Sequence, residues 1–597
     1  MPDLLRNMTA IQHHRGPDAR DVWIAGSANI GLCHNRLSII DLSIAGNQPM
    51  RSHDSRFVIV FNGEIYNYVE LAQELKNLGA RFASQSDTEV LLEAYRQWGD
   101  GMLPRLRGMY AFAIYDSTDK SLFCARDVLG KKPFVYAETA DLFAFASEIP
   151  AVRQVPGVDL SFDVDSLAAM LVHNLRHIPD PGTAYRGIKR LRAGHAMRIV
   201  AGRIERIWRH WIPEKTSDAT TPARLREILE ESIRIRMRAD VPVGALLSGG
   251  VDSSAITALM QRQSKHPVHT YALGLNEYDE DLRRARIAAQ AIGTVHREFM
   301  FDADEQWELF QRLIAVYGEP IMLLPLLHTH ALCRGIRDDG IKVVLNGNGA
   351  DELFFGYTGH LRTFRISRWL DRLQPFLPLV SPLSSTRVGW MTAKPGEKKA
   401  KYYQYLALMD WSSCLSDDAI PALHNQAAEE MRYWGAAQPS GHFIDESNFM
   451  GLMVENTHSV TIAGDLPAMM ASVEMRSPFL DREMVAFAFS TPAEKKIPDV
   501  NNPDWLKAIL REAVRDLVPE GLLLAPKRGF GMGIQEADLL RGPWRDHAAA
   551  MFEYPKDCGG LFDPIKITAL WRQFCAGKGS ASRLARLLAV QTWLCQA

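Results

Sequence analysis

The chain has 597 residues, a mass of 67.0 kDa and a formal net charge of −2, from 68 Lys and Arg against 70 Asp and Glu. Hydrophobic residues make up 47% of it, which is enough for large cores and excludes wholesale disorder. The balanced charge gives no basic surface for nucleic acid, and no apolar run reaches the roughly 18 residues of a membrane span. We therefore expect neither a nucleic-acid nor a membrane partner.

The cysteines and the first residues indicate a cytoplasmic protein. Seven scattered cysteines without a CxxC pair favour reduced thiols over disulfides or a structural zinc site. The chain begins with Met1 to Arg6 and shows no apolar core of a signal peptide. By size and composition, we expect a cytoplasmic enzyme.

The first 150 residues predict an α+β domain. Apolar runs at 57–61, 109–115 and 121–125 each end at a turn or polar residues and predict strands. Helices are expected at 70–78 and 88–98. Strands and helices at this spacing are typical of an α+β fold.

A polar segment at 213–222 predicts a linker, after which helices and strands alternate. The predicted elements are helices at 225–237 and 255–263 and strands at 243–247, 270–274 and 342–345. Short apolar strands between helices indicate a parallel sheet covered on both faces. From about residue 359 the pattern is mostly helical.

The strongest local motif is Ser248-Gly249-Gly250-Val251-Asp252-Ser253-Ser254, between a predicted strand and a helix. Its glycines let backbone N–H groups approach an anion, and the following helix directs its positive end at the same point. Asp252 suits a Mg²⁺ that bridges phosphates. The motif resembles the pyrophosphate-binding loop of ATP pyrophosphatases, and it lacks the Gly-Lys-Ser/Thr of a Walker A loop.

A second loop, Asn346-Gly347-Asn348-Gly349-Ala350-Asp351, follows the predicted strand at 342–345. It therefore lies at the carboxyl edge of the sheet, where ligands collect in open α/β folds. Asp351 is the natural second carboxylate for the metal.

Further motifs occur in order along nearly all of the chain. They are His14–Asp18, Arg36–Asp41, Asn62–Asn67, Ser86–Glu89, Ala125–Asp127, Gly130–Pro133, Ala146–Glu148, Arg476–Asp481 and Pro526–Phe530. Together they resemble the asparagine synthetase family, class II glutamine amidotransferases with an N-terminal glutaminase and a C-terminal synthetase. The resemblance implies an N-terminal nucleophile-hydrolase-like α+β glutaminase at 1–195 and a connector at 196–222. It implies an α/β parallel-sheet ATP-pyrophosphatase (HUP-like) synthetase, with a helical C-terminal region, at 223–597.

The resemblance also implies the glutamine site. Arg36 would pair with the glutamine carboxylate, for which its planar fork of donors is suited, and Asp87 would hold the ammonium. Asn62 and Gly63 would form the oxyanion hole, and Glu64 would be a further substrate contact.

In the synthetase half the resemblance implies ATP and Mg²⁺ as cofactors. The implied ATP-binding residues are Leu247, Ser248, Gly249, Gly250, Asp252, Ser253, Ser254, Leu273, Asn346 and Gly347, with Asp252 and Asp351 at the metal. A carboxylate would attack ATP to give an acyl-adenylate and pyrophosphate, and ammonia would then displace AMP. Lys527 matches the family lysine that stabilises the charge in both steps. The implied enzyme is a C–N ligase of the glutamine-hydrolysing asparagine synthase type, and a homodimer is one option.

The family nucleophile is an N-terminal cysteine about twenty or more residues before the His-Arg-Gly-Pro-Asp motif, which here starts at His14. The first cysteine is Cys33, inside a predicted apolar strand, where we expect a buried thiol. As written, the chain is not expected to hydrolyse glutamine by the family mechanism. Either the start was assigned downstream of the real one or the glutaminase is defunct, and we expect the first.

The acceptor is open. The family loop usually reads Ser-Gly-Glu/Asp-Gly, whereas here Asn346 replaces the serine and Asn348 the acid, and the basic residue usual after Asp465 is missing. A non-aspartate acceptor, such as a uronic-acid sugar or a peptide carboxylate, is therefore an alternative. Two more alternatives are a ligase that cyclises its own acceptor and a non-catalytic nucleotide-binding relic.

Overall fold

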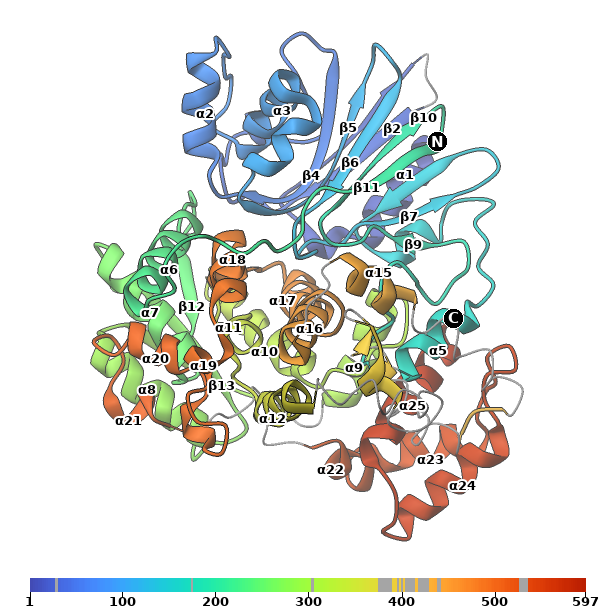
Figure 1. The fold of residues 1–597 in the computed structure, drawn as a ribbon. Helices are drawn as coiled ribbons and strands as arrows, with labels where there is room; N and C mark the ends of the chain where they lie inside the picture. The colour runs from blue at the N-terminus through green and yellow to red at the C-terminus, as the bar shows by residue number, and fades with distance from the viewer. Residues whose placement is uncertain are drawn as a thin grey trace.

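The computed structural model describes residues 1–26, 30–172, 175–301, 305–373, 389–394, 397–398, 401–402, 414–416, 429–437, 442–525 and 535–597. Most of the N-terminal third forms the upper body in Figure 1, and the rest of the chain forms the lower body. Within the described ranges, every helix is too short or too polar to cross a bilayer.

The N-terminal body is built on a six-stranded antiparallel sheet in the order β11-β10-β6-β5-β4-β3. Its strands are β3 (Met50–Arg51), β4 (Phe57–Ile65), β5 (Gly108–Asp116), β6 (Ser121–Arg126), β10 (His195–Val200) and β11 (Arg203–Arg209). Helices α2 (Tyr68–Asn77) and α3 (Asp87–Trp98) pack on one face through an apolar cluster. The domain is therefore α+β, as predicted, and the predicted strands and helices of the first 150 residues are all present.

The other face of this sheet packs against two smaller antiparallel sheets. They are β1 (Ala19–Ala25) with β2 (Ile30–Arg36), and β8 (Phe143–Ala146), β7 (Val135–Glu138) and β9 (Lys189–Arg190) in that order. Helix α1 (Pro2–Ile11) precedes them, and α4 (Ile149–Val152) and α5 (Val164–Val172) follow β8. The apolar layer between the sheets includes Val60, Ala113 and Phe134, and it also lies next to the first of the cavities described below.

The C-terminal body is built on a five-stranded, all-parallel sheet in the order β14-β13-β12-β15-β16. The strands are β12 (Val243–Leu246), β13 (His269–Gly274), β14 (Val295–Met300), β15 (Val343–Leu345) and β16 (Glu474–Arg476). The three predicted strands are β12, β13 and β15, and the parallel α/β class is confirmed. The strand order reverses between β12 and β15, so the loops that follow these two strands meet at the switch point where α/β sheets bind ligands.

Helices cover this sheet and form the remaining C-terminal region (Figure 1). Around the sheet lie α6 (Pro222–Arg236), α7 (Val251–Gln263), α8 (Glu280–Ile292), α9 (Gln306–Tyr317), α10 (Pro325–Asp338) and α11 (Ala350–Phe354). Beyond it are α12 (Thr358–Leu373), α15 (Glu429–Ala437), α16 (Phe443–Met450), α17 (Thr457–Met470), α18 (Arg482–Ser490), α19 (Ala493–Lys496) and α20 (Ala508–Ala513). The chain ends with α21 (Glu520–Leu523), α22 (Glu536–Arg541), α23 (Arg545–Glu553), α24 (Pro564–Cys575) and α25 (Ala581–Gln596).

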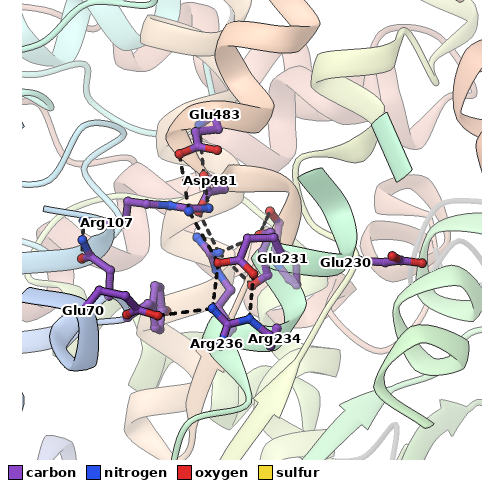
Figure 2. A network of polar contacts seen from close by, with 12 residues as sticks. Glu70, Arg107, Glu230, Glu231, Arg234, Arg236, Asp481 and Glu483 are labelled. Atoms are coloured by element: carbon purple, nitrogen blue, oxygen red, sulfur yellow. Dashed lines mark hydrogen bonds and ion pairs between the residues drawn. The ribbon is translucent and has the colours of Figure 1, made fainter. Parts of the chain in front are cut away.

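Ion pairs join the two bodies at a buried carboxylate, Asp481, at the start of α18 (Figure 2). Arg107 of the N-terminal body lies 3.2 Å from it, and Arg236 of α6 donates to its second oxygen at 2.9 Å. Burial alone would raise the pKa of Asp481, but these two guanidinium groups more than offset it and hold the pKa far below its usual range. We call Arg107, Arg236 and Asp481 the interdomain clamp.

A second set of interdomain contacts lies deeper. Arg15 donates to Asp465 of α17 at 2.7 Å, and Lys132 lies 3.2 Å from the same carboxylate and 3.7 Å from Glu474 of β16. Near the surface, Lys342 pairs with Asp18 at 2.7 Å. Several of the motifs noted above therefore lie where the two bodies meet.

Candidate active sites

A cavity of about 160 Å³ lies in the N-terminal body at the junction with the C-terminal body. All five residues predicted for glutamine line it, namely Arg36, Asn62, Gly63, Glu64 and Asp87. Met469 and Glu474 of the C-terminal body line it as well. We call it the glutamine cavity. The structure thus brings together residues from four separate motifs and adds a wall from the other half of the chain.

Arg36, at the end of β2, is buried and held in place by neutral acceptors. Its guanidinium donates to the Ser43 carbonyl and the Asn47 amide oxygen, each at 2.8 Å, and also to the carbonyls of Ile40 and Asp41. Among the described residues it has no ion-pair partner within 4 Å. A fixed, unneutralised guanidinium at a cavity wall suits a substrate carboxylate.

The opposite part of the cavity is acidic. Burial raises the pKa of Asp87 to about 6, although its carboxylate accepts a hydrogen bond from the Ile65 backbone at 2.9 Å. Burial also raises the pKa of Glu64 well above its usual value, although Arg476 opposes the shift from 3.1 Å. One Glu64 oxygen, Oε2, is buried with no hydrogen-bond partner among the described residues. Buried acids of this kind are stabilised by a bound cation such as an ammonium group.

Backbone geometry makes a side chain at position 63 impossible. Gly63 has a φ of +143°, and a Cβ there would lie 2.0 Å from the Met109 carbonyl oxygen. The neighbouring Asn62 side chain donates to the Ser147 hydroxyl at 3.2 Å. This is the pair predicted to form the oxyanion hole.

Cys33 lies in β2 and lines the same cavity. Burial raises the pKa of the Cys33 thiol to about 11, so the group stays protonated near neutral pH. Burial also lowers the pKa of the adjacent His34 to about 4, and its ring bonds to the Phe61 carbonyl. Neither residue has the properties of an activated nucleophile or its base.

A second cavity, of about 260 Å³, lies at the carboxyl edge of the parallel sheet. Of the residues predicted to bind ATP and metal, those that line it are Leu247, Ser248, Gly250, Asp252, Ser253, Leu273, Asn346, Gly347 and Asp351. We call it the nucleotide cavity. Ser254 is fully buried in α7 and Gly249 lies behind the wall, so the structure does not bring these two predicted residues to the surface of the cavity.

The first loop is shaped by Gly249, whose φ is +69°. A Cβ at this position would lie 2.4 Å from the Arg284 carbonyl carbon, so the loop can pack against α8 only with glycine here. Within the loop, the Ser253 hydroxyl accepts from the Ser248 backbone N–H at 3.2 Å. Helix α7 begins immediately afterwards at Val251 and directs its N-terminus at the cavity.

Asn346 begins the second loop. Its backbone N–H donates to the Arg476 carbonyl at 3.0 Å, and its side-chain oxygen accepts from the Ser477 hydroxyl at 2.8 Å. The amide nitrogen of Asn346 is buried and has no partner in the part of the chain that the structure describes. A buried donor without a partner costs free energy unless a ligand supplies the acceptor.

The two predicted metal ligands, Asp252 and Asp351, face a common cation. Lys507 Nζ lies 2.6 Å from Asp252 Oδ2 and 2.5 Å from Asp351 Oδ1. Burial alone would lower the pKa of Lys507, but the two carboxylates more than offset it and raise the pKa. Asp252 Oδ1 is buried and has no partner within the described ranges. Mg²⁺ commonly uses one or two carboxylates together with substrate phosphates, so this pair of acids fits it.

Sequence reasoning missed several residues of the nucleotide cavity. Lys507 and Arg511 lie one turn apart at the start of α20 and reach the cavity from far along the chain. Glu352, whose pKa is raised by burial, accepts a hydrogen bond from the Tyr357 hydroxyl at 2.5 Å. Lys507 has a φ of +58°, unusual for a lysine, but the sequence gives no sign of that. The predicted Lys527 lies outside the described residues.

These two cavities define a two-site protein, with an α+β domain of amidotransferase type joined to a parallel-sheet α/β domain. Residues 224–595 match the asparagine synthase family model, and residues 1–211 match the glutamine amidotransferase domain model. The chain belongs to the asparagine synthase family, and it is an enzyme of the ligase or amidotransferase type.

Relatives along the whole chain agree with this assignment. A putative glutamine-hydrolysing asparagine synthetase of Mycobacterium tuberculosis is 33% identical over 98% of this chain and 92% of its own length. Asparagine synthetase 3 of Bacillus subtilis is 30% identical over 88% of this chain and 83% of its own. Amidase chry2 of Gibberella zeae is 26% identical over 87% and 83%, respectively.

Proposed function

We propose that the protein uses ATP and Mg²⁺ to convert a substrate carboxylate into an amide, with nitrogen from glutamine or from free ammonia. The observation that carries this proposal is the position of β16. Glu474 lines the glutamine cavity and the next residue, Met475, lines the nucleotide cavity. Because successive side chains of a strand point to opposite sides, one strand separates the two cavities. A nitrogen donor and an activated acceptor would thus be held back to back.

In the first step, a carboxylate oxygen of the acceptor attacks the α-phosphorus of ATP and pyrophosphate leaves. The loop N–H groups at 248–253 and the N-terminus of α7 would hold the phosphates, and Lys507 lies within reach of the same charges. Asp252 and Asp351 would hold Mg²⁺, which supplies charge to the phosphate oxygens when bound.

In the second step, the ammonia lone pair attacks the acyl carbon, the bond to AMP breaks and the nitrogen loses a proton. Ammonia released in the glutamine cavity would reach this carbon without meeting bulk water, where it would be protonated. In this scheme Lys527 is the cation that stabilises the charge of both steps.

ATP–pyrophosphate exchange across a panel of carboxylates tests the proposal. We expect exchange with one class of acceptor, and loss of exchange in Lys527→Ala with the fold retained. Exchange with no carboxylate at all would favour a nucleotide-binding relic. An amide formed without ammonia or glutamine would indicate a cyclising acceptor.

A second candidate concerns the acceptor. Asn348 lines the nucleotide cavity at the position where the family usually has an acid, and a neutral amide offers no charge to an amino-acid ammonium group. This favours a non-aspartate carboxylate, such as a uronic-acid sugar or a peptide. Efficient ammonia-dependent conversion of free aspartate to asparagine would contradict it.

A further inference from the structure

The glutamine cavity depends on one arginine of the C-terminal body. Arg476 is the last residue of β16, and its side chain is fully buried where the two bodies meet. We infer that Arg476 is a positioning residue of the glutamine site, which acts by holding Glu64 as an oriented carboxylate. This inference rests on the proposed use of glutamine.

The guanidinium of Arg476 is fixed from several directions. It lies 3.1 Å from Glu64 Oε1 and donates to Glu474 at 2.9 Å. It also donates to the backbone carbonyls of Arg236 and Arg238, at 2.8 and 2.7 Å. A planar fork of donors can meet this set of acceptors, whereas a single ammonium group cannot.

The charges around Glu64 explain why the arginine is needed. Glu64, Asp87 and Glu474 are three buried acids at the same end of the glutamine cavity. The nearest other cation is Lys132, which lies 3.7 Å from Glu474 and is shared with Asp465. Without Arg476, burial would leave Glu64 protonated. With Arg476 on Oε1, the second oxygen remains an acceptor for a donor group of glutamine.

The backbone of the same residue belongs to the nucleotide cavity, because its carbonyl accepts from Asn346. Its side chain does not line that cavity. A side-chain substitution should therefore change glutamine binding and leave nucleotide binding nearly unchanged. A general loosening of the fold would weaken both.

The test is calorimetric titration of the full chain with L-glutamine and, separately, with ATP and Mg²⁺. The variants are Arg476→Met, Glu64→Gln, the double variant, and Arg107→Met as the matched control. Arg107 is also an interdomain arginine, but it belongs to the clamp and lines neither cavity. We expect Arg476→Met to weaken glutamine binding about 10- to 100-fold, the range typical of a buried charge that loses its partner. ATP affinity should stay within about threefold.

The double variant shows whether the arginine acts through Glu64. If it does, the double variant binds glutamine no more weakly than Glu64→Gln alone, within about threefold. The double variant has no unpaired Glu64 charge, so this comparison decides the matter even if Arg476→Met fails to fold. Additive losses, an unchanged affinity in Arg476→Met, or an equal loss in Arg107→Met would overturn the inference. If the parent chain itself does not bind glutamine, the proposed function fails and this inference fails with it.

Discussion

At the scale of single residues, Lys507 connects the two acids of the nucleotide cavity. Its Nζ is within 2.6 Å of both Asp252 and Asp351, and its backbone is held at a φ of +58°. A non-glycine residue in the left-handed region persists only where the surroundings require it, and such residues cluster at functional sites. Without a metal ion, Lys507 is what neutralises these buried carboxylates.

Replacing Lys507 by Met should therefore make stability depend on Mg²⁺. The variant leaves two buried acids without their cation, and we expect a loss of about 3 kcal/mol in the free energy of unfolding. Thermal unfolding with and without Mg²⁺ measures it, and the metal should raise the melting temperature more in the variant than in the parent. Lys495→Met, at an exposed lysine bonded to Thr220, is the control and should show neither effect. An equal response to Mg²⁺ in parent and variant would refute the prediction.

Asp87 gives a pH dependence whose sign follows from burial. Because its pKa is raised to about 6, Asp87 is largely protonated at pH 5.5 before glutamine binds. A bound ammonium group favours the carboxylate, so binding at pH 5.5 should release roughly half a proton or more, and almost none at pH 8. Glutamine affinity should accordingly rise with pH up to about 6 and then level off.

Calorimetry in buffers of different ionisation enthalpy counts these protons directly. The folded-state pKa lies above the unfolded value of about 3.9, so ionising Asp87 costs stability as pH rises from about 4 through 6. Proton release that is the same at pH 5.5 and pH 8 would show that Asp87 does not face the ammonium group.

At the scale of elements, the phosphate loop depends on which of its two glycines is replaced. A Cβ at Gly249 would meet the Arg284 backbone at 2.4 Å, whereas at Gly250 the nearest atom, Ser248 Oγ, is 3.5 Å away. Gly250 also has a φ of −75°, which any residue can adopt.

Gly249→Ala should therefore destabilise the fold by about 1–3 kcal/mol and abolish binding of ATP with Mg²⁺, since the loop must move away from α8. Gly250→Ala is the matched control and should remain stable. Chemical denaturation and ATP titration of both variants check this. Equal behaviour of the two would mean that the strain at Gly249 is relieved elsewhere.

The sequence predicted elements well where one periodic pattern continued over several residues. β4, β5 and β12 are apolar runs, and α6 begins with a Thr221 cap and an amphipathic pattern. β16 was missed because Glu474-Met475-Arg476 is short and charged, and only its place beside β15 makes it a strand. In the same way, motifs indicated which residues gather at the two cavities. The contributions of Lys507 and Arg476 arise only when distant segments pack, so no local pattern could reveal them.

At the scale of the whole molecule, the family motifs serve the interface as well as the two cavities. Lys131 donates to the Leu480 carbonyl at 3.0 Å, and Lys132 reaches Asp465. Asp481 of the Arg476–Asp481 motif carries the interdomain clamp. The motifs that do not belong to a cavity thus hold the cavities in a fixed relation.

Asp481→Asn should lower the free energy of unfolding by about 3–5 kcal/mol, because two buried guanidinium groups lose their partner. Because the pKa of Asp481 is lowered in the folded chain, its contribution is present above pH 4 and is lost as pH falls further. Glu483→Gln is the control, since Glu483 is half exposed and pairs with Arg107 at 3.4 Å, and it should cost less than about 1 kcal/mol. Urea denaturation at pH 7 and pH 4 tests both. A similar small loss in the two variants would mean that the clamp is not what joins the bodies.

The Arg476–Glu64 pair also bears on how such a chain can be recombined. A chimera that took its first 211 residues from one relative and the remainder from another would split this pair and the Lys132–Asp465 pair across parents. Its amidotransferase half could be correct in every residue and still have a misplaced acid in its donor site. Breakpoints between the two halves should therefore succeed only among relatives that share both partners of each pair.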